Sequence, residues 1–200
     1  METRQAIKSR RSAKHFDPDH IMPEEDKKDL LELALLSPTS FNIQNWRFVI
    51  VEDPDRRQAI RAAAWDQAQV TDASMLILLC ADIKSWDKDP QRYWQEASQS
   101  IQEMIVPMIK PFYEDQNILQ RDEAMRSVGI SAQTLMLAAK AMGYDSCPMI
   151  GFDADKVAEI INLPEDHVIG MMLVIGKTTA PAYPRSGQLS LDEVVIRDSF

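Results

Sequence analysis

Residues 37–51 read SPTSFNIQNWRFVIV, and this stretch decides the fold because it joins an apolar helix to a buried strand. Upstream, apolar residues at helical spacing over 30–36 predict an amphipathic helix that begins near Pro23. Pro38 ends that helix, since the residue before a proline is disfavoured in the α region. The polar residues that follow predict a loop, and the apolar run 48–51 predicts a strand. The chain therefore mixes helices with strands.

Working outward, the same patterns predict further elements on both sides of this stretch. Helices are expected at 3–11, 56–65, 92–115, 125–142 and 154–161, and strands at 75–81, 145–150 and 168–175. Strands and helices do not alternate regularly and helices dominate, so we expect one α+β domain over residues 1–200.

Two segments of this domain differ in their expected structure from the rest. Residues 84–120 contain no strand candidate and are a possible helical cap, in which Pro107 and Pro111 are expected to kink or break the helix. Residues 177–200 contain Pro181, Pro184 and Gly187 and are expected to form an extended C-terminal arm.

Composition excludes several classes of function. The 200 residues are 45% hydrophobic, and 22 Lys+Arg against 31 Asp+Glu give a net charge of −9, which argues against a nucleic-acid partner. The longest apolar run, Met75–Ala81, is far shorter than the roughly 20 residues of a membrane helix, and the first residues have no apolar h-region, so we expect no signal peptide there. We expect a cytoplasmic protein with no membrane partner, in which Cys80 and Cys147 are reduced. Scattered histidines and the lack of a CxxC pair argue against a metal site.

Residues 9–14 concentrate positive charge and hydroxyl groups within an acidic protein. Arg10, Arg11, Ser12 and Lys14 could together hold a phosphate, because arginine matches phosphate oxygens with two donors and lysine adds a point charge. The alternative is a solvated basic turn, which is the usual outcome for a short charge run. The pattern alone leaves both interpretations open.

The polar loop 37–46 is a second candidate site. Its hydroxyls and amides could contact a flat polar heterocycle, or they could satisfy the loop's own backbone. The chain has no GxGxxG, GxxxxGK[ST] or GxSxG motif, so neither a Rossmann-type NAD domain, a P-loop nor a serine nucleophile elbow is supported.

Taken together, five segments in register resemble the FMN-dependent nitroreductase-like family. They are residues 10–16, 37–48, 67–74 and 148–153, and Gly176–Lys177 followed by Pro184–Arg185. The resemblance implies an α+β homodimer whose central antiparallel or mixed sheet is surrounded by helices, with two FMN sites at the subunit interface. It implies electron transfer from NADH or NADPH to FMN and then, by a ping-pong scheme, to a nitroaromatic, a quinone or a similar small molecule.

The alternative is an FMN-binding module or sensor without steady-state turnover, since that class shares every binding motif. In either case the flavin carries the chemistry, so the resemblance implies no catalytic acid or base from the protein.

Carried onto this chain, the resemblance assigns roles to residues in each segment. Arg10, Ser12 and Arg185 would contact the FMN phosphate. Arg11 would contribute backbone groups, and Lys14 would reach the pyrimidine edge of the ring.

The remaining predicted contacts surround the ring system. Gln69 would hydrogen-bond the ring or the ribityl chain, and Ile150 and Gly151 would offer backbone N–H groups near the flavin N5. Many family members have a glutamate where this chain has Ile150, so only the backbone role is carried over there. The partner subunit would supply a set from the polar loop: Pro38, Thr39, Ser40 and Asn42. Aromatic residues of the possible cap could line the acceptor pocket or pack as core or interface: Trp94, Phe112 and Tyr113.

Overall fold

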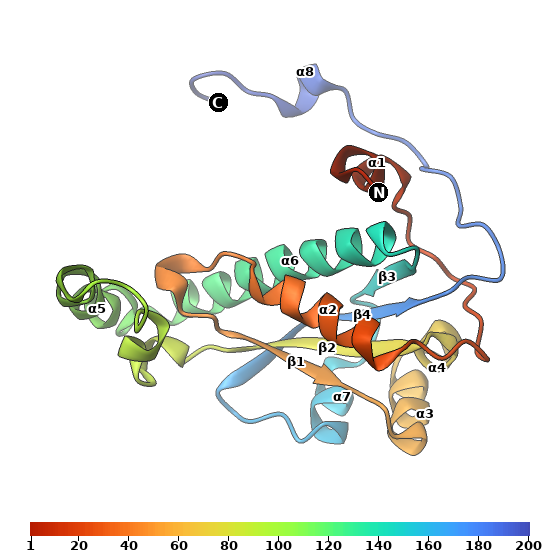
Figure 1. The fold of residues 1–200 in the computed structure, drawn as a ribbon, viewed down its shortest axis with the longest axis horizontal. Helices are drawn as coiled ribbons and strands as arrows, with labels where there is room; N and C mark the ends of the chain where they lie inside the picture. Colours follow the sequence, from red (N-terminus) through yellow and green to blue (C-terminus); the bar gives the residue numbers. More distant parts are fainter.

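The computed structural model describes residues 1–200, and a four-stranded sheet lies at its centre (Figure 1). The spatial order is β1-β2-β4-β3 and every neighbouring pair is antiparallel. The strands are β1 (Trp46–Ile50), β2 (Met75–Asp82), β3 (Asp145–Met149) and β4 (His167–Gly176). With helices on both faces, the α+β prediction is confirmed. Strands β1 and β3 form the two outer edges of the sheet.

Strand β2 is buried on both faces, which explains its uninterrupted apolar sequence. Successive side chains of a strand point to opposite faces. Leu76, Leu78 and Cys80 belong to one core cluster, while Ile77 and Leu79 belong to the other. Because both faces exclude water, the strand shows no alternation of polar and apolar residues.

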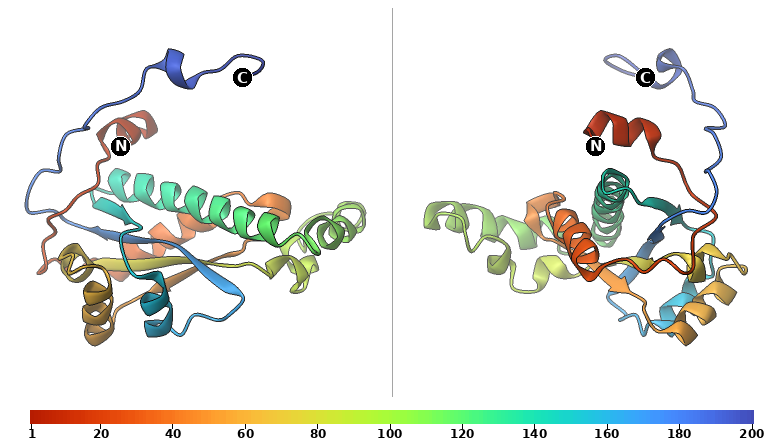
Figure 2. Two further views of the ribbon diagram at one scale, coloured as in Figure 1. Left: turned by 180° about the vertical axis from the view of Figure 1, so that it is seen from behind. Right: turned by 45° about the vertical axis from the view of Figure 1, so that its right-hand side comes forward.

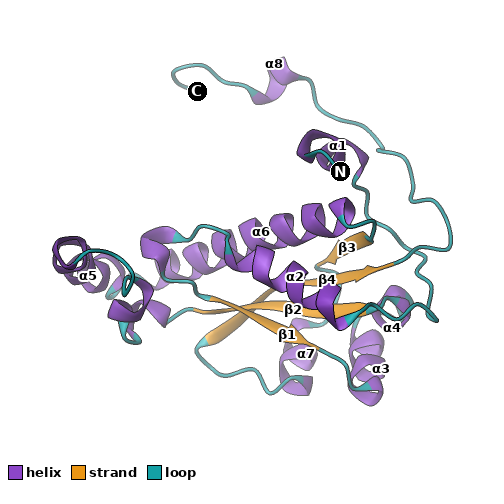
Figure 3. Cartoon of the chain, in the orientation of Figure 1, coloured by secondary structure: helices purple, strands orange, loops and turns teal.

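Helices cover both faces of this sheet (Figures 2 and 3). On one face lie α2 (Glu24–Leu35) and the long α6 (Asn117–Ala141), which pack against the sheet in one cluster. The opposite cluster includes residues of α3 (Pro54–Ala63), α4 (Gln69–Asp72) and α7 (Ala154–Ile160). The short α1 (Thr3–Ser9) precedes all of them. None of the helices has the length and apolar character needed to cross a membrane.

The segment 84–120 differs from its prediction in detail. It contains the 3-10 turns η2 (Ser85–Asp87) and η3 (Pro90–Tyr93), and the helix α5 (Gln99–Tyr113) begins only after them. Helix α5 runs through both prolines without a break. Pro107 and Pro111 are four residues apart and exposed, so the carbonyl groups that lose a donor can be hydrated on one outer face. The role of this segment as a cap stays a prediction.

Two other predicted boundaries are corrected. Strand β1 begins at Trp46 rather than at residue 48, and α6 begins at Asn117 rather than at residue 125. Polar residues outnumber apolar ones in the added first turns of α6, so apolar periodicity alone does not reveal them.

After β4 the chain leaves the sheet as an extended arm that passes above α1 (Figure 1). The arm contains one short helix, α8 (Leu191–Val194), and all of its residues from 183 onward are exposed.

Candidate functional site

Edge strand β3 brings together several residues that the sequence predicts as ligands. Ser12 forms a parallel bridge with Ser146 near the start of the strand. Lys14 Nζ donates a hydrogen bond of 3.5 Å to Cys147 Sγ, one residue further on. The segment that follows α1 is therefore laid against the first half of β3, from Ser146 to Cys147.

Arg10 and Arg185 converge at this end although they are 175 residues apart. Arg185 Nη2 donates to the carbonyl oxygens of Ile7 and Arg10, at 3.2 and 3.4 Å. Arg10 Nη1 is itself buried and has no hydrogen-bond partner. Burial lowers the pKa of Arg10, and the neighbouring charges of Arg185 and Arg11 lower it further. An unpaired guanidinium among like charges is an arrangement that a bound anion would stabilise.

The other basic residues of the segment have different surroundings. Arg11 Nη1 donates to the carbonyl oxygens of Lys8 and Arg10, at 2.7 and 2.8 Å. Its side chain therefore supplies hydrogen bonds to carbonyl groups at the C-terminal end of α1. Ser12 is exposed. Burial raises the pKa of the Cys147 thiol, while the charges of Lys14 and Arg10 oppose that rise. The thiol therefore stays protonated and leaves the positive charge of the cluster uncompensated.

At the far end of β3, Gln69 lies near the two residues that follow the strand. Gln69 Nε2 donates to Gln67 Oε1 at 3.0 Å and to Met149 Sδ at 3.8 Å. Gln67 Nε2 in turn donates to the carbonyl oxygen of Gly151 at 2.9 Å. The backbone N–H groups of Ile150 and Gly151 donate no hydrogen bond within the chain. Two adjacent donors are thus free at the end of the strand.

The backbone at Gly151 is closely approached by an exposed ring. A Cβ at this position would lie 2.8 Å from Trp65 Cζ3, so only glycine fits without a shift of the indole. Ile150 and Trp65 are 81% and 71% exposed, which is unusual for such large apolar side chains. The free N–H groups therefore sit beside an open apolar surface, which suits the face of a planar ring.

The polar loop is not brought to β3 within the chain. It precedes β1, on the opposite edge of the sheet, so Pro38, Thr39, Ser40 and Asn42 lie away from the basic cluster (Figure 1). Phe41, Asn42 and Gln44 adopt positive φ angles of 50°, 52° and 41°, which non-glycine residues rarely adopt.

Hydrogen bonds hold this strained loop. The Ser40 N–H donates to Glu123 Oε1 at 3.1 Å, and Asn42 Nδ2 donates to the carbonyl oxygen of Tyr93 at 2.7 Å. The Gln44 N–H donates to Thr39 Oγ1 at 3.0 Å. The loop thus partly satisfies its own backbone, which is the alternative that the sequence left open, but contacts with distant elements also fix it.

Aromatic residues of segment 84–120 pack beneath the loop. Tyr113 is buried in a small cluster with Ile43, Trp86, Tyr93 and Ile109. Trp94 packs against that cluster and its Nε1 donates to the Phe41 carbonyl oxygen at 3.0 Å, whereas Phe112 is exposed. Tyr113 is therefore core, and for Trp94 and Phe112 the two alternatives, lining the acceptor pocket or packing as core or interface, stay open.

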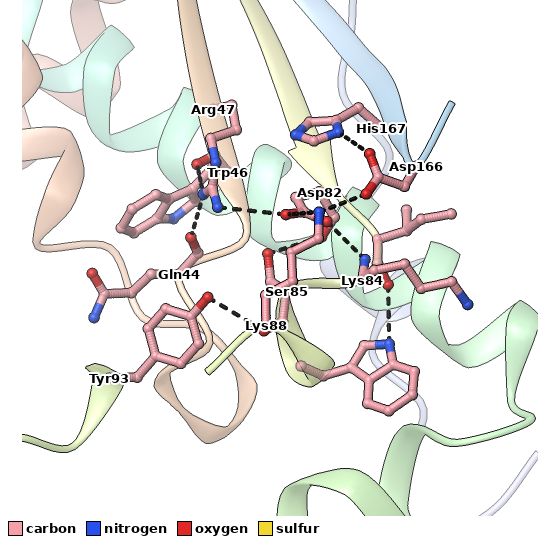
Figure 4. A network of polar contacts seen from close by, with 12 residues as sticks. Gln44, Trp46, Arg47, Asp82, Lys84, Ser85, Lys88, Tyr93, Asp166 and His167 are labelled. Atoms are coloured by element: carbon pink, nitrogen blue, oxygen red, sulfur yellow. Dashed lines mark hydrogen bonds and ion pairs between the residues drawn. The ribbon is translucent and has the colours of Figure 1, made fainter. Parts of the chain in front are cut away.

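A network of charged side chains lies at the C-terminal end of β2 (Figure 4). Lys88 Nζ bridges Asp82 Oδ2 at 2.8 Å and Asp166 Oδ2 at 2.5 Å, and Arg47 Nη2 lies 3.6 Å from Asp82. The hydrogen bonds from Lys88 and His167 lower the pKa of Asp166 to about 2. Oxygen and nitrogen atoms of Asp82, Asp166 and His167 lie within 4.8 Å of one another, but protein cations already neutralise these carboxylates.

The sequence did not reveal every residue of these clusters. Gln67 orients Gln69 and Gly151, and its place in the segment 67–74 was the only signal for it. Ser146 and Cys147 belong to the basic cluster only because they contact Ser12 and Lys14, which are far away in the sequence.

Comparisons with known proteins agree with this geometry. The family model described as "Nitroreductase family" matches residues 7–177. Protein DrgA of Synechocystis sp. is 57% identical over 93% of this chain and 90% of its own length. The Bacillus subtilis protein with the provisional name NAD(P)H nitroreductase MhqN is 33% identical over 94% of this chain and 95% of its own.

A solved structure adds the fold itself. A protein of Exiguobacterium sibiricum, described provisionally as a nitroreductase in complex with FMN, superimposes with a TM-score of 0.89. It is 29% identical and the match covers 98% of this chain and 97% of that one. The family model, the relatives and the fold agree: this chain belongs to the nitroreductase family.

Proposed function

We propose that the protein is an FMN-dependent NAD(P)H oxidoreductase that passes electrons to nitroaromatics, quinones or similar small molecules. The observation that carries this proposal is Arg10 Nη1, a buried donor without a partner beside Arg185. A dianionic phosphate would supply the missing acceptor and offset the repulsion between the two guanidinium groups. Family membership and the FMN in the related structure support this choice of ligand.

The phosphate end of the site comprises Arg10, Ser12 and Arg185, with backbone groups of Arg11. Ser12 contributes an exposed hydroxyl, and the bond from Arg185 to the Arg10 carbonyl keeps the two arginines together. Lys14 is laid along β3 towards the middle of the strand, where it can reach the pyrimidine edge of the ring. The strand therefore spaces the ligands: residues 146 and 150 are about 13 Å apart along it, which suits an elongated ligand.

The ring end of the site comprises Gln69, Ile150 and Gly151. The free N–H groups of Ile150 and Gly151 can donate to the ring, and the amide of Gln69 can contact the ring or the ribityl chain. When bound, FMN supplies hydride acceptance from NADH or NADPH and electron transfer to the acceptor. The protein then needs only to bind and orient, so no side chain has to act as a catalytic acid or base.

The donor and the acceptor would use this open face in turn, which gives ping-pong kinetics. The exposed Ile150 and Trp65 leave the surface beside the two free donors accessible to a planar molecule. A shared face excludes simultaneous occupation, so one substrate leaves before the next one binds.

The site would be completed by a second copy of the chain. Pro38, Thr39, Ser40 and Asn42 lie at the edge opposite β3, so one chain cannot place them on the ligand that its own Arg10 holds. The C-terminal arm carries exposed apolar side chains that a partner could cover, among them Leu189, Leu191, Val194, Val195 and Ile196. Each subunit of this homodimer would lend its polar loop to the other subunit's flavin.

Spectroscopy and kinetics test the proposal. The purified protein should be yellow, and its flavin absorbance should bleach when NADH or NADPH is added without oxygen. NAD(P)H oxidation should then accelerate when menadione or a nitroaromatic is added, with the parallel reciprocal plots of a ping-pong scheme. A colourless protein that stays inactive after FMN is supplied contradicts the proposal. Flavin that is bound but not reduced over minutes would instead identify a binding module or sensor.

Light scattering at low micromolar concentration tests the oligomeric state. We expect the mass of two 22.8 kDa chains for the full-length protein. A monomer that retains bound FMN and full activity would overturn the two-chain site.

A further inference from the structure

A groove separate from β3 lies between the polar loop and segment 84–120. It has a volume of about 810 Å³, and its wall includes Asn42, Gln44 and Trp46 from the loop side and Arg92 and Trp94 from the other. The guanidinium of Arg47 also lines it. The groove is therefore large enough for a small aromatic molecule and rich in hydrogen-bond donors.

The two arginines of this groove are held differently. Arg47 Nη1 donates to the carbonyl oxygens of Gln44 and Trp46, both at 2.9 Å, and Nη2 faces Asp82 at 3.6 Å. These contacts hold the Arg47 guanidinium in place (Figure 4). The carboxylate that it faces, Asp82, already forms an ion pair with Lys88.

The exposed guanidinium of Arg92 has no carboxylate within ion-pair distance and makes no hydrogen bond within the chain. Its guanidinium lies 5.3 Å from the ring centre of Tyr93, a contact that orients the side chain without consuming its donors. Glu96 also lines the groove and is the one carboxylate there. Against this single negative charge stand two guanidinium groups, in a protein whose net charge is −9.

A buried donor supplies an independent sign of a ligand. Trp46 is 5% exposed and lines the groove, yet its Nε1 has no hydrogen-bond acceptor. An indole N–H that is buried without a partner costs free energy unless something accepts its hydrogen bond. The groove thus offers an unpaired guanidinium beside aromatic surface, and one of its lining side chains carries an unsatisfied N–H.

We propose that this groove binds the anionic group of an aromatic substrate, with Arg92 as the residue that selects for the anion. The inference rests on the proposed function, because Asn42 both lines the groove and belongs to the loop that would reach the partner's flavin. The shared chemistry is a sulfonate, carboxylate or phosphate carried by an aromatic molecule. Its source is either an acidic substituent on the electron acceptor or the 2′-phosphate of NADPH.

Direct binding gives a first test that does not depend on turnover. Naphthalene-2-sulfonate is redox-inert, and its binding should quench the fluorescence of Trp46 and Trp94. Arg92→Gln should weaken this binding about tenfold, the effect of losing one charge-assisted hydrogen bond. Arg56→Gln is the matched control, because Arg56 is an exposed arginine on α3, outside the groove, and should leave the affinity at the wild-type value.

Steady-state kinetics separates the two sources of the anion. If the acceptor carries it, Arg92→Gln should raise the ratio of the KM for 1,4-naphthoquinone-2-sulfonate to the KM for menadione about tenfold. If the donor carries it, the ratio of the KM for NADPH to the KM for NADH should rise instead. Unchanged ratios together with unchanged naphthalene-2-sulfonate binding would overturn the inference. The proposed function would survive that result, since flavin content and menadione turnover test it separately.

Discussion

Replacing Arg10 with glutamine should weaken FMN binding without destabilising the FMN-free protein. Within the chain Arg10 Nη1 is buried with no partner and Arg185 lies beside it, so without a bound anion the side chain would contribute repulsion and desolvation. Hydrogen bonds to charged groups are worth about 1.5–3 kcal/mol, so the loss should raise the Kd for FMN about 10- to 150-fold. Removing an unpaired charge should leave the thermal midpoint of the FMN-free protein equal to that of wild type or higher.

Two measurements check these expectations together. Calorimetric titration of FMN into the FMN-free variant gives the Kd, and a thermal melt of the same sample gives its stability. Arg4→Gln is the matched control, because Arg4 is an exposed arginine on α1. Arg10→Lys should recover only part of the affinity, since lysine keeps the charge but loses the planar pair of donors. A Kd for Arg10→Gln within about twofold of wild type would remove Arg10 from the site and refute the reasoning.

Further substitutions test packing, capping and charge. Gly170→Ala should lower the free energy of unfolding by about 1–3 kcal/mol, because its Cβ would lie 2.5 Å from Val128 Cγ1. Gly129→Ala, inside α6 with nothing within 4 Å of the added Cβ, should raise it by up to about 1 kcal/mol, and equal urea midpoints for the two would contradict the packing argument. Asp53→Ala should cost about 1 kcal/mol, because the carboxylate accepts the hydrogen bond that caps α3; unchanged thermal stability would exclude that cap. Asp166→Asn should cost at most about 1 kcal/mol at pH 7, since the ion pair is partly exposed. The folded-state pKa of Asp166 is lowered from 3.8 to about 2, so denaturant titrations should show this difference shrinking as the pH falls from about 4 to about 2, and a constant difference would contradict it.

The sequence predicts the layout of the fold well because the strongest signals are local. The apolar runs of β2 and β4 and the periodicity of α2 each specify an element without knowledge of its neighbours. The start of α5 is different: the pattern predicts a helix from residue 92, but Asp89 adopts a left-handed conformation with a φ of 50°, Pro90 opens a 3-10 turn, and the helix begins only at Gln99.

Only those parts of the candidate site that form a contiguous sequence motif could be predicted. Residues 10–14 are contiguous, so the concentration of charge is visible in the sequence, and the family pattern adds Arg185. The pairing of Arg47 with Arg92 across one groove could not be predicted, because it depends on how segment 84–120 folds back over the polar loop. The absence of a carboxylate partner for Arg92 is likewise a property of the folded chain.

The small apolar cluster beneath the polar loop shares no member with the two clusters that sandwich the sheet. Opening it would expose five buried side chains while leaving the sheet and its helices intact. Exchanges among its aromatic residues, or a change in the length of α5, should therefore alter the surroundings of the polar loop at little cost to the body that holds the basic cluster. The surroundings of the polar loop and the strand end that carries Arg10 and Lys14 can therefore vary independently of each other.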